Sequence, residues 1–343
     1  MKKIISLGLL LLGVGMMGVS TVAESVSQYE NPVFEPVLAD PTLIRAEDGT
    51  FYAYGTEDDW GDGAGPHLIP ILRSDNMTEW EYVDDAFASK PDWKEEGGLW
   101  APHIAYHQGT YLLYYSMSTW GDPNPGIGVA TASHPAGPFQ DQGPLFTSEE
   151  IGVDNSIDPM FFVDDGKPTL IWGSFHGIYG IRLSDDGLKT EGEKFPIAGN
   201  AFEAPYLIKR DGNYYLFVSL GSCCEGESST YHVAVGRAEA IEGPYRDREG
   251  NDLLHSNGSP VLVGDQEAEK EKRFVGPGHN AVFRDDDGTD WIVYHGIDPT
   301  NPYLLGGATR RPLLIDRLRW KDGWPQVEGL VPSTEPMTGP VWK

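Results

Sequence analysis

The sequence is short of cysteine, basic residues and helical periodicity, and each shortage excludes something. Its only cysteines in 343 residues, Cys223 and Cys224, are adjacent, so no disulfide can join distant parts of the chain. They either close a vicinal ring or stay reduced, and we expect a structural role rather than a redox one.

Lys and Arg total 25 against 52 Asp and Glu, a formal net charge of -27. Such a surface repels phosphate backbones and anionic lipids, so nucleic acid is not an expected partner, whereas a neutral polysaccharide or a divalent cation is compatible.

The N-terminus has the pattern of a signal peptide. Lys2 and Lys3 precede an apolar run over residues 4–19, and Thr21-Val22-Ala23 is a small-x-Ala cleavage motif. The alternative is an uncleaved membrane anchor, but the run barely reaches the length of about 20 residues that a span needs. We therefore predict residues 1–23 as a signal peptide cut after Ala23, and a secreted or periplasmic protein that does not stay in a membrane.

Residues 24–343 contain no linker rich in Ser, Thr or Pro and no second long apolar run, which predicts one domain. Short segments rich in Tyr, Val, Ile, Leu and Phe alternate with turn residues, as is typical of all-β proteins. Five of these segments start with a polar or proline-bearing residue and run into a strand: 39–44, 100–105, 157–162, 202–207 and 278–283. Each is followed by a turn dipeptide and a second apolar strand; the dipeptides are Asp48-Gly49, Gln108-Gly109, Asp165-Gly166, Asp211-Gly212 and Asp287-Gly288.

The spacing of these starts is about 60 residues, which is room for a four-stranded blade with its loops. The repeat predicts a five-bladed β-propeller, in which the first strand of every blade lines the central channel. Residues at the repeat starts then converge on one axis. They include Asp40, Asp158, Glu203 and His279, with Trp100 and His103 from the second repeat.

Three carboxyl groups at one end of a channel can divide the roles of glycosidic hydrolysis. Like charges and burial both disfavour ionisation, so at least one carboxyl is expected to stay protonated at neutral pH. A protonated acid facing an ionised base is what cleavage of a glycosidic bond requires. Taken singly, an Asp or Glu before Pro at a strand entry is usually a turn former. Three in register across different repeats favour a functional interpretation.

Four motifs at the repeat starts resemble those of glycoside hydrolase family 43. They are Ala39-Asp40-Pro41, Ile157-Asp158-Pro159, Glu203-Ala204-Pro205 and Gly276-Pro277-Gly278-His279-Asn280. The resemblance implies a five-bladed propeller that hydrolyses arabinose- or xylose-containing polysaccharides with inversion at the anomeric carbon. It also implies that Asp40 is the general base, that Glu203 is the general acid, and that Asp158 positions Glu203 and keeps its pKa high.

Further local patterns, among them residues 114–120, 172–175 and 223–226, resemble the arabinanase branch, whose members act on α-1,5-linked arabinan. This resemblance places Trp100 and Trp120 against sugar rings, with Ser174 near the catalytic sugar. We also predict that His103, from the second repeat start, binds the substrate. It places His279 at a calcium ion on the channel axis, directly or through water, although a hydrated sodium ion or plain water could occupy the same place. Calcium prefers oxygen ligands, so water and carbonyl groups would hold most of its coordination sphere.

Three functional alternatives follow. The first is an arabinanase-like hydrolase acting on arabinan or arabino-oligosaccharides, whether endo or exo, as a monomer. The second is an exo-acting β-xylosidase or α-L-arabinofuranosidase of the same family. The third is a non-catalytic sugar-binding propeller. Three other acidic clusters, at residues 57–59, 164–165 and 285–287, are predicted as solvated turns rather than metal sites.

Overall fold

The computed structural model describes residues 27–264 and 274–343. The predicted signal peptide therefore lies outside the described residues. Within them, no helix combines the length and the apolar character needed to cross a membrane.

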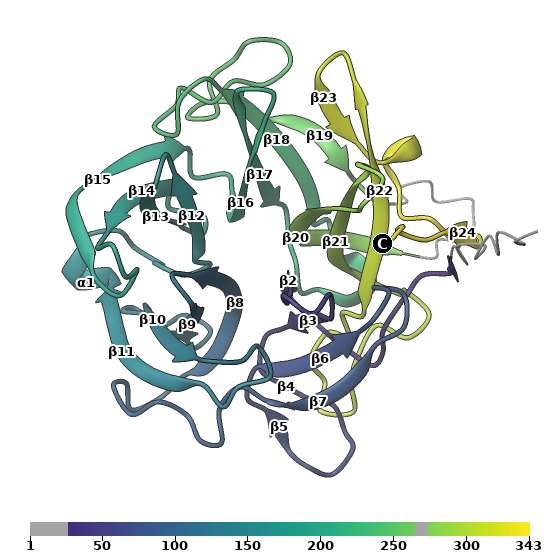
Figure 1. Cartoon of the computed structure of the whole chain (residues 1–343), viewed down its shortest axis with the longest axis horizontal. Coiled ribbons are helices and arrows are strands. Elements are labelled where there is room, and N and C mark those ends of the chain that lie inside the picture. The colour runs from purple at the N-terminus through teal and green to yellow at the C-terminus, as the bar shows by residue number, and fades with distance from the viewer. Residues whose placement is uncertain (1–26, 265–273) are drawn as a thin grey trace, which may run out of the picture.

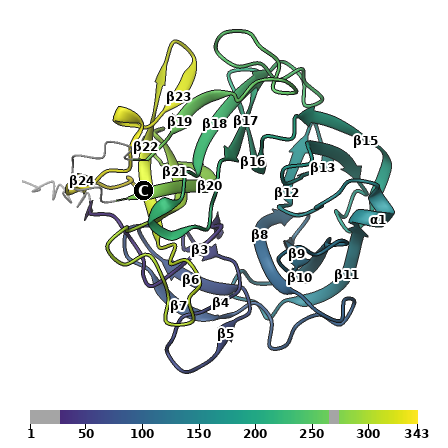
Figure 2. The same cartoon turned by 180° about the vertical axis from the view of Figure 1, so that it is seen from behind.

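Five antiparallel sheets of four strands each form a ring around a central axis (Figures 1 and 2). We number these blades 1 to 5 in chain order. Their strands, from the innermost outward, are as follows. Blade 1 has β2 (Thr42–Arg45), β3 (Phe51–Tyr54), β6 (Pro70–Ser74) and β7 (Glu81–Asp85). Blade 2 has β8 (Gly98–His107), β9 (Thr110–Ser118), β10 (Gly126–Ala132) and β11 (Gln140–Thr147). Blade 3 has β12 (Met160–Asp164), β13 (Lys167–Trp172), β14 (Ile178–Leu183) and β15 (Thr190–Ala198). Blade 4 has β16 (Glu203–Arg210), β17 (Asn213–Leu220), β18 (His232–Ala238) and β19 (Ser259–Leu262). Blade 5 has β20 (Val275–Arg284), β21 (Asp290–Ile297), β22 (Leu313–Lys321) and β23 (Trp324–Gln326). The predicted five-bladed β-propeller is confirmed.

Short elements complete the described chain. Two-stranded pairings join β1 (Gln28–Tyr29) to β24 (Met337–Thr338) and β4 (Asp58–Asp59) to β5 (Pro66–His67). The helix α1 (Ser148–Ile151) links blades 2 and 3, and single 3₁₀ turns occur at Gly226–Ser228 and Glu328–Leu330.

The predicted turn dipeptides close the hairpins between the first and second strands. In blades 3 and 4 the two turn residues have positive φ, 47° and 80° at Asp165-Gly166 and 50° and 82° at Asp211-Gly212. Two consecutive left-handed residues form the type I′ turn whose twist matches that of a hairpin, and the second position suits glycine. The local sequence therefore determines where each hairpin turns.

The apolar core lies between the blades. Each of the five large clusters of buried side chains in the described residues joins two neighbouring blades. Between blades 2 and 3, for example, the rings of Tyr114 and Phe161 stack at 5.5 Å. Between blades 5 and 1, Trp291 packs with Phe51, and Phe51 also contacts Trp342 near the C-terminus, with ring centroids 4.4 Å apart. Both faces of a blade are buried in this way, which explains why the second strands are almost continuously apolar.

The acidic clusters differ in their surroundings. Asp285 accepts hydrogen bonds from the backbone of Asp287 and Thr289, so the predicted turn is present, but Asp285 itself is buried and only Asp286 and Asp287 are exposed. Asp164 is buried and pairs with Lys209 and the hydroxyl of Tyr214, so only its neighbour Asp165 is an exposed turn residue. The prediction for residues 57–59 is wrong in part, because Glu57 and Asp58 line the cavity described next.

Candidate active site

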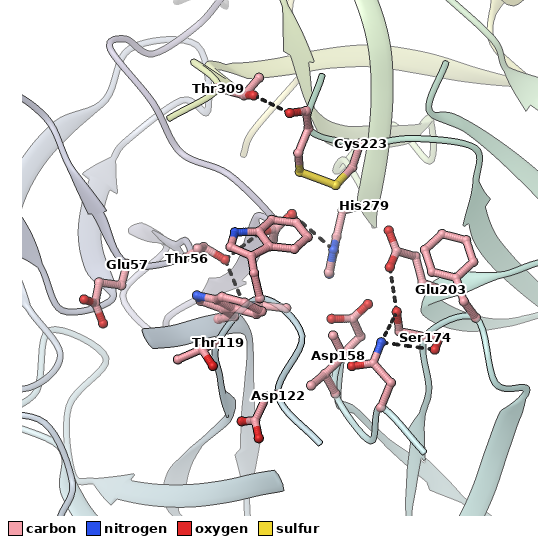
Figure 3. A pocket seen from close by; sticks show the side chains of 18 of the residues that line it. Thr56, Glu57, Thr119, Asp122, Asp158, Ser174, Glu203, Cys223, His279 and Thr309 are labelled. Carbon is pink, nitrogen blue, oxygen red and sulfur yellow. Dashed lines mark hydrogen bonds and ion pairs between the residues drawn. A yellow bond between two sulfur atoms is a disulfide. The ribbon is translucent and has the colours of Figure 1, made fainter. Parts of the chain in front are cut away.

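A cavity of about 960 Å³ opens at the centre of the ring and receives residues from all five blades (Figure 3). The inner-strand starts contribute Asp40, Trp100, Asp158, Glu203 and His279 to its lining. The volume is near the upper end of the range for small-molecule sites. The structure thus brings together the acidic residues that the repeat predicts to converge.

The same left-handed backbone conformation recurs at every inner-strand start. A residue with positive φ stands there in each blade: 54° at Asp40, 43° at Ala101, 59° at Asp158, 53° at Ala204 and 49° at His279. Non-glycine residues rarely adopt this conformation, and where they do they cluster at functional sites. The left-handed turn presents the side chain of that residue, or of the one before it, to the cavity.

A side chain accepts the backbone N–H of each of these residues. In four blades the acceptor belongs to the preceding blade, at or just after its second strand. The four contacts are Asp40 to His295 Nδ1 (3.0 Å), Ala101 to Thr56 Oγ1 (2.8 Å), Asp158 to Ser116 Oγ (2.9 Å) and His279 to Ser219 Oγ (2.9 Å). These bonds join neighbouring blades at the cavity and satisfy donors that the inner strands leave unpaired.

Blade 4 departs from this pattern. The N–H of Ala204 donates to Asp158 Oδ2 at 3.0 Å, instead of to the equivalent serine of blade 3, Ser174. Ser174 is thereby free to donate its hydroxyl to Glu203 Oε2 at 2.8 Å, and Asn155 donates to Ser174 Oγ at 2.9 Å. Asp158 therefore holds the backbone next to Glu203, and Ser174 holds its carboxyl group.

Asp40 is buried but held in its ionised form. Burial alone would raise its pKa, yet the Arg311 guanidinium and His279 outweigh burial and hold the pKa well below the usual range. Arg311 Nη1 lies 3.0 Å from Asp40 Oδ1, and Thr56 donates its hydroxyl to Oδ2 at 2.5 Å. A general base must be ionised, and here buried cationic partners, rather than exposure to solvent, keep Asp40 ionised.

The pKa values of Asp158 and Glu203 are shifted upward, in the opposite direction to that of Asp40. Burial raises the pKa of Asp158 to about 8, with His279 acting against it and Glu203 adding to it. The pKa of Glu203 is also raised, mainly by burial, although hydrogen bonds from Tyr231 and Ser174 act against the rise. The sequence attributes the raised pKa of Glu203 to its neighbour Asp158, whereas desolvation is the larger cause. The cavity thus holds one ionised carboxylate and a pair that retains a proton at neutral pH.

Two histidines flank Asp40. Burial opposes a charge on His279, but Asp40, 3.3 Å from its Nδ1, together with Asp158 and Glu203 raises its pKa. His295 is fully buried, and its pKa is lowered to about 4, chiefly by burial, so the neutral ring accepts the N–H of Asp40. An imidazolium at His279 would be a second cation beside Asp40.

The residues predicted to bind sugar lie in different places. Trp100 and Trp120 line the cavity with ring centroids 5.5 Å apart, and 79% of Trp120 is exposed. Ser174 also lines the cavity, although it is buried against Glu203. Within the described chain His103 is not among the lining residues: it is buried behind them, its ring 6.0 Å from that of Tyr206.

Four features in or beside the cavity were not found by reading the sequence. Arg311, from the segment before β22, lines the cavity. Tyr231, from the segment before β18, is buried and hydrogen-bonds Glu203. Asp58 is largely buried beside Arg311 and Asp40, and burial raises its pKa to about 7. Cys223 and Cys224 form a vicinal disulfide that lines the cavity, which settles the choice left open above. No signal in a single sequence links these positions to the repeat starts.

The fold and the cavity define a class: a five-bladed propeller with an acid–base set of carboxyl groups at its axis, as in hydrolases of polysaccharides. Residues 29–325 match the family described as "Glycosyl hydrolases family 43". The chain belongs to this family and is a glycoside hydrolase.

Individual relatives support the same family assignment. The chain is 34% identical over 320 residues to an extracellular exo-α-(1→5)-L-arabinofuranosidase of Cellvibrio japonicus, covering 84% of this chain and 86% of the relative. It is 33% identical over 303 residues to an extracellular endo-α-(1→5)-L-arabinanase of Bacillus subtilis, covering 84% and 87%. The solved structure of a Cellvibrio cellulosa α-L-arabinanase complexed with arabinohexaose superimposes with a TM-score of 0.74 at 32% identity, covering 87% of this chain and 97% of that one.

Proposed function

We propose that this protein is a secreted, inverting hydrolase of α-1,5-linked arabinan or arabino-oligosaccharides. Asp40 takes a proton from water as the water oxygen attacks the anomeric carbon, while Glu203 gives its proton to the leaving oxygen as the glycosidic bond breaks. Asp158 positions Glu203 through the backbone of Ala204. The observation that carries this proposal is that Asp40 and Glu203 line one cavity and that their pKa values are shifted in opposite directions, down for Asp40 and up for Glu203.

The choice of substrate and location rests on the relatives. Their names specify α-1,5-linked arabinan chemistry and an extracellular location, and they include both exo- and endo-acting enzymes. An exo-acting α-L-arabinofuranosidase therefore remains the second candidate. Secretion also agrees with the signal-peptide pattern of residues 1–23. We further expect the enzyme to act as a monomer.

We propose calcium only as an ion whose ligands are mostly water molecules. In the described chain no three His, Cys, Asp or Glu side chains lie together as a ligand set. His279 Nδ1 faces Asp40 at 3.3 Å, which leaves Nε2 as the ring nitrogen that can face an ion or its water shell. The buried amide of Asn280, the next residue, has no partner at its nitrogen or its oxygen in the described part of the structure. A buried amide oxygen on the innermost strand β20 suits an ion that keeps most of its water.

The test compares three proteins on debranched arabinan: wild type, Asp40→Asn and Glu203→Gln. Each substitution should lower kcat by about 10²–10⁴-fold, the usual contribution of general acid or base catalysis. An aryl arabinofuranoside with an activated leaving group should restore the rate of Glu203→Gln but not of Asp40→Asn, because only the acid becomes dispensable. Proton NMR of the first-formed product should show an inverted anomeric centre. Wild-type rates in both variants would contradict the assigned roles.

Product lengths over time decide between the two candidates. Mixed oligosaccharides at early times indicate endo action, and steady release of one short product indicates exo action. Hydrolysis of aryl β-xylosides in preference to arabinan would instead favour a β-xylosidase.

A further inference from the structure

The vicinal disulfide has no part in the proposed acid–base chemistry, yet it lies in the cavity wall. Cys223 and Cys224 are half-buried and line the cavity together with Tyr303 and Thr309. In Figure 3 the disulfide is drawn on the other side of the view from Thr119 and Asp122.

The turn that carries the disulfide is already held by other contacts. Thr309 Oγ1 donates to the carbonyl of Cys224 at 2.8 Å. The two ends of the turn are joined by backbone bonds from Thr230 and Tyr231 to the carbonyl of Ser222, at 3.1 and 3.0 Å. Its middle is fixed where the N–H of Glu225 donates to Ser229 Oγ at 2.9 Å. The backbone therefore does not depend on the sulfur–sulfur bond for its path.

The outer side of the turn is also supported. Gly226 has a φ of 56°, and a Cβ atom there would lie 2.4 Å from the Tyr303 hydroxyl oxygen. Tyr303 thus packs directly on the turn from the following blade, where a larger side chain would not fit. The turn, Tyr303 and Thr309 form a fixed wall, with the disulfide as its apolar part.

The remaining lining shows why such a surface is useful. The centre of the cavity is strongly polar, with Asp40, Asp158, Glu203, His279 and Arg311. A furanose ring carries C–H groups as well as hydroxyls, and it needs apolar contacts to leave water with a gain in free energy. Trp100 and Trp120 offer one such surface. The disulfide is the apolar surface contributed by blade 4.

We propose that the Cys223–Cys224 disulfide is a sugar-contacting element that contributes affinity for arabino-oligosaccharides, and this inference rests on the proposed function. Its sulfur atoms pack against a sugar residue in the cavity. They provide a flat, polarisable contact that two separate thiols, free to rotate, do not reproduce.

The experiment measures binding separately from catalysis. The dissociation constants of linear α-1,5-arabino-oligosaccharides of two to six sugars are determined by titration calorimetry in a Glu203→Gln background, with the disulfide intact or replaced by Cys223→Ala and Cys224→Ala. Loss of the disulfide should weaken binding about tenfold for oligosaccharides that reach the wall, the scale of one lost apolar contact in a pocket. In the active enzyme KM should rise by more than kcat falls. Treatment of the wild type with a phosphine reductant should reproduce the change, and the double variant should not respond to it.

Two controls keep the inference testable. Cys224→Ser alone opens the ring while retaining one sulfur, and it serves if the double variant does not fold. The alkaline limb of the kcat–pH profile tests the rival role, in which the disulfide only holds Tyr231 against Glu203. The inference is overturned if the disulfide variants bind the oligosaccharides with unchanged dissociation constants, or if the alkaline limb of their kcat–pH profile is displaced. In either case, hydrolysis of arabinan by the wild type would still support the proposed function. A wild type that neither binds nor cleaves these oligosaccharides overturns both.

Discussion

Arg311→Met should shift the acidic limb of the profile of kcat/KM against pH to higher pH. The reason is that Arg311 is the main group that keeps the buried Asp40 ionised. Arg311 Nη1 lies 3.0 Å from Asp40 Oδ1. An opposite charge at such a distance lowers a carboxyl pKa by about 1–3 units, which is about 1.4–4 kcal/mol. A neutral hydrogen bond, such as that from Thr56, contributes about 1 kcal/mol. The hydroxyl therefore cannot replace the guanidinium.

The assay is kcat/KM on an arabino-oligosaccharide as a function of pH, since this ratio reports the pKa values of the free enzyme. The base must be ionised, so activity falls as the pH drops through the pKa of Asp40. In Arg311→Met we expect the midpoint of this fall to rise by about 1–3 pH units. The variant should recover part of its activity as the pH is raised. A loss of substrate contacts alone would lower kcat/KM equally at every pH and leave the midpoint in place.

The adjacent Arg310 provides a matched control. It is also buried and pairs with Glu35, but it does not line the cavity within the described chain. Arg310→Met should disturb packing to a similar degree without moving the acidic limb. If folded Arg311→Met has the same acidic midpoint as the wild type, Arg311 does not control the ionisation of Asp40 and the argument fails.

Three further predictions concern other residues of the cavity. Ser174→Ala removes a hydrogen bond that lowers the pKa of Glu203, so the alkaline limb of kcat should move to higher pH by less than about one unit while kcat itself falls; an alkaline limb at lower pH would contradict this. Trp120→Ala should raise KM for oligosaccharides about tenfold, with Trp120→Phe intermediate, because an exposed indole offers mainly stacking area; equal KM values for all three proteins would exclude the contact. Asp58 has a folded-state pKa of about 7 against an ordinary value of 3.8, so its contribution to stability is lost as the pH rises between these values. Asp58→Asn should therefore make the free energy of unfolding decline less between pH 5 and 7.5, as measured by denaturant titration. If the variant and the wild type show the same decline with pH, Asp58 is not buried as described.

The architecture could be predicted because its signals are local and repeated. Each hairpin turn is coded by two adjacent residues such as Asp165-Gly166, the spacing of the repeat gives the size of a blade, and the number of repeat starts gives the number of blades. The strand entries can also be recognised in the sequence, because an acidic residue before a proline stands at the same place in the first and third repeats, at Asp40 and Asp158. Once a ring is inferred, convergence of these residues on the axis follows from geometry.

The causes of the protonation states could not be predicted, because they depend on contacts between residues far apart in the chain. Arg311 pairs with Asp40 across 271 positions of sequence. The link from Asp158 to Ala204 and the bond from Ser174 to Glu203 depend on how blade 4 departs from the other four. His103 shows the limit of the repeat argument, since it is near a repeat start but buried behind the cavity.

The sequence alone therefore determined the all-β repeat, the number of blades and the identity of the converging carboxyl groups, because turns and strand periodicity are properties of neighbouring residues. Only the tertiary structure decided what keeps Asp40 ionised, what raises the pKa values of Asp158 and Glu203, and where the disulfide lies. Those outcomes depend on burial and on partners that the chain brings together only when the ring closes.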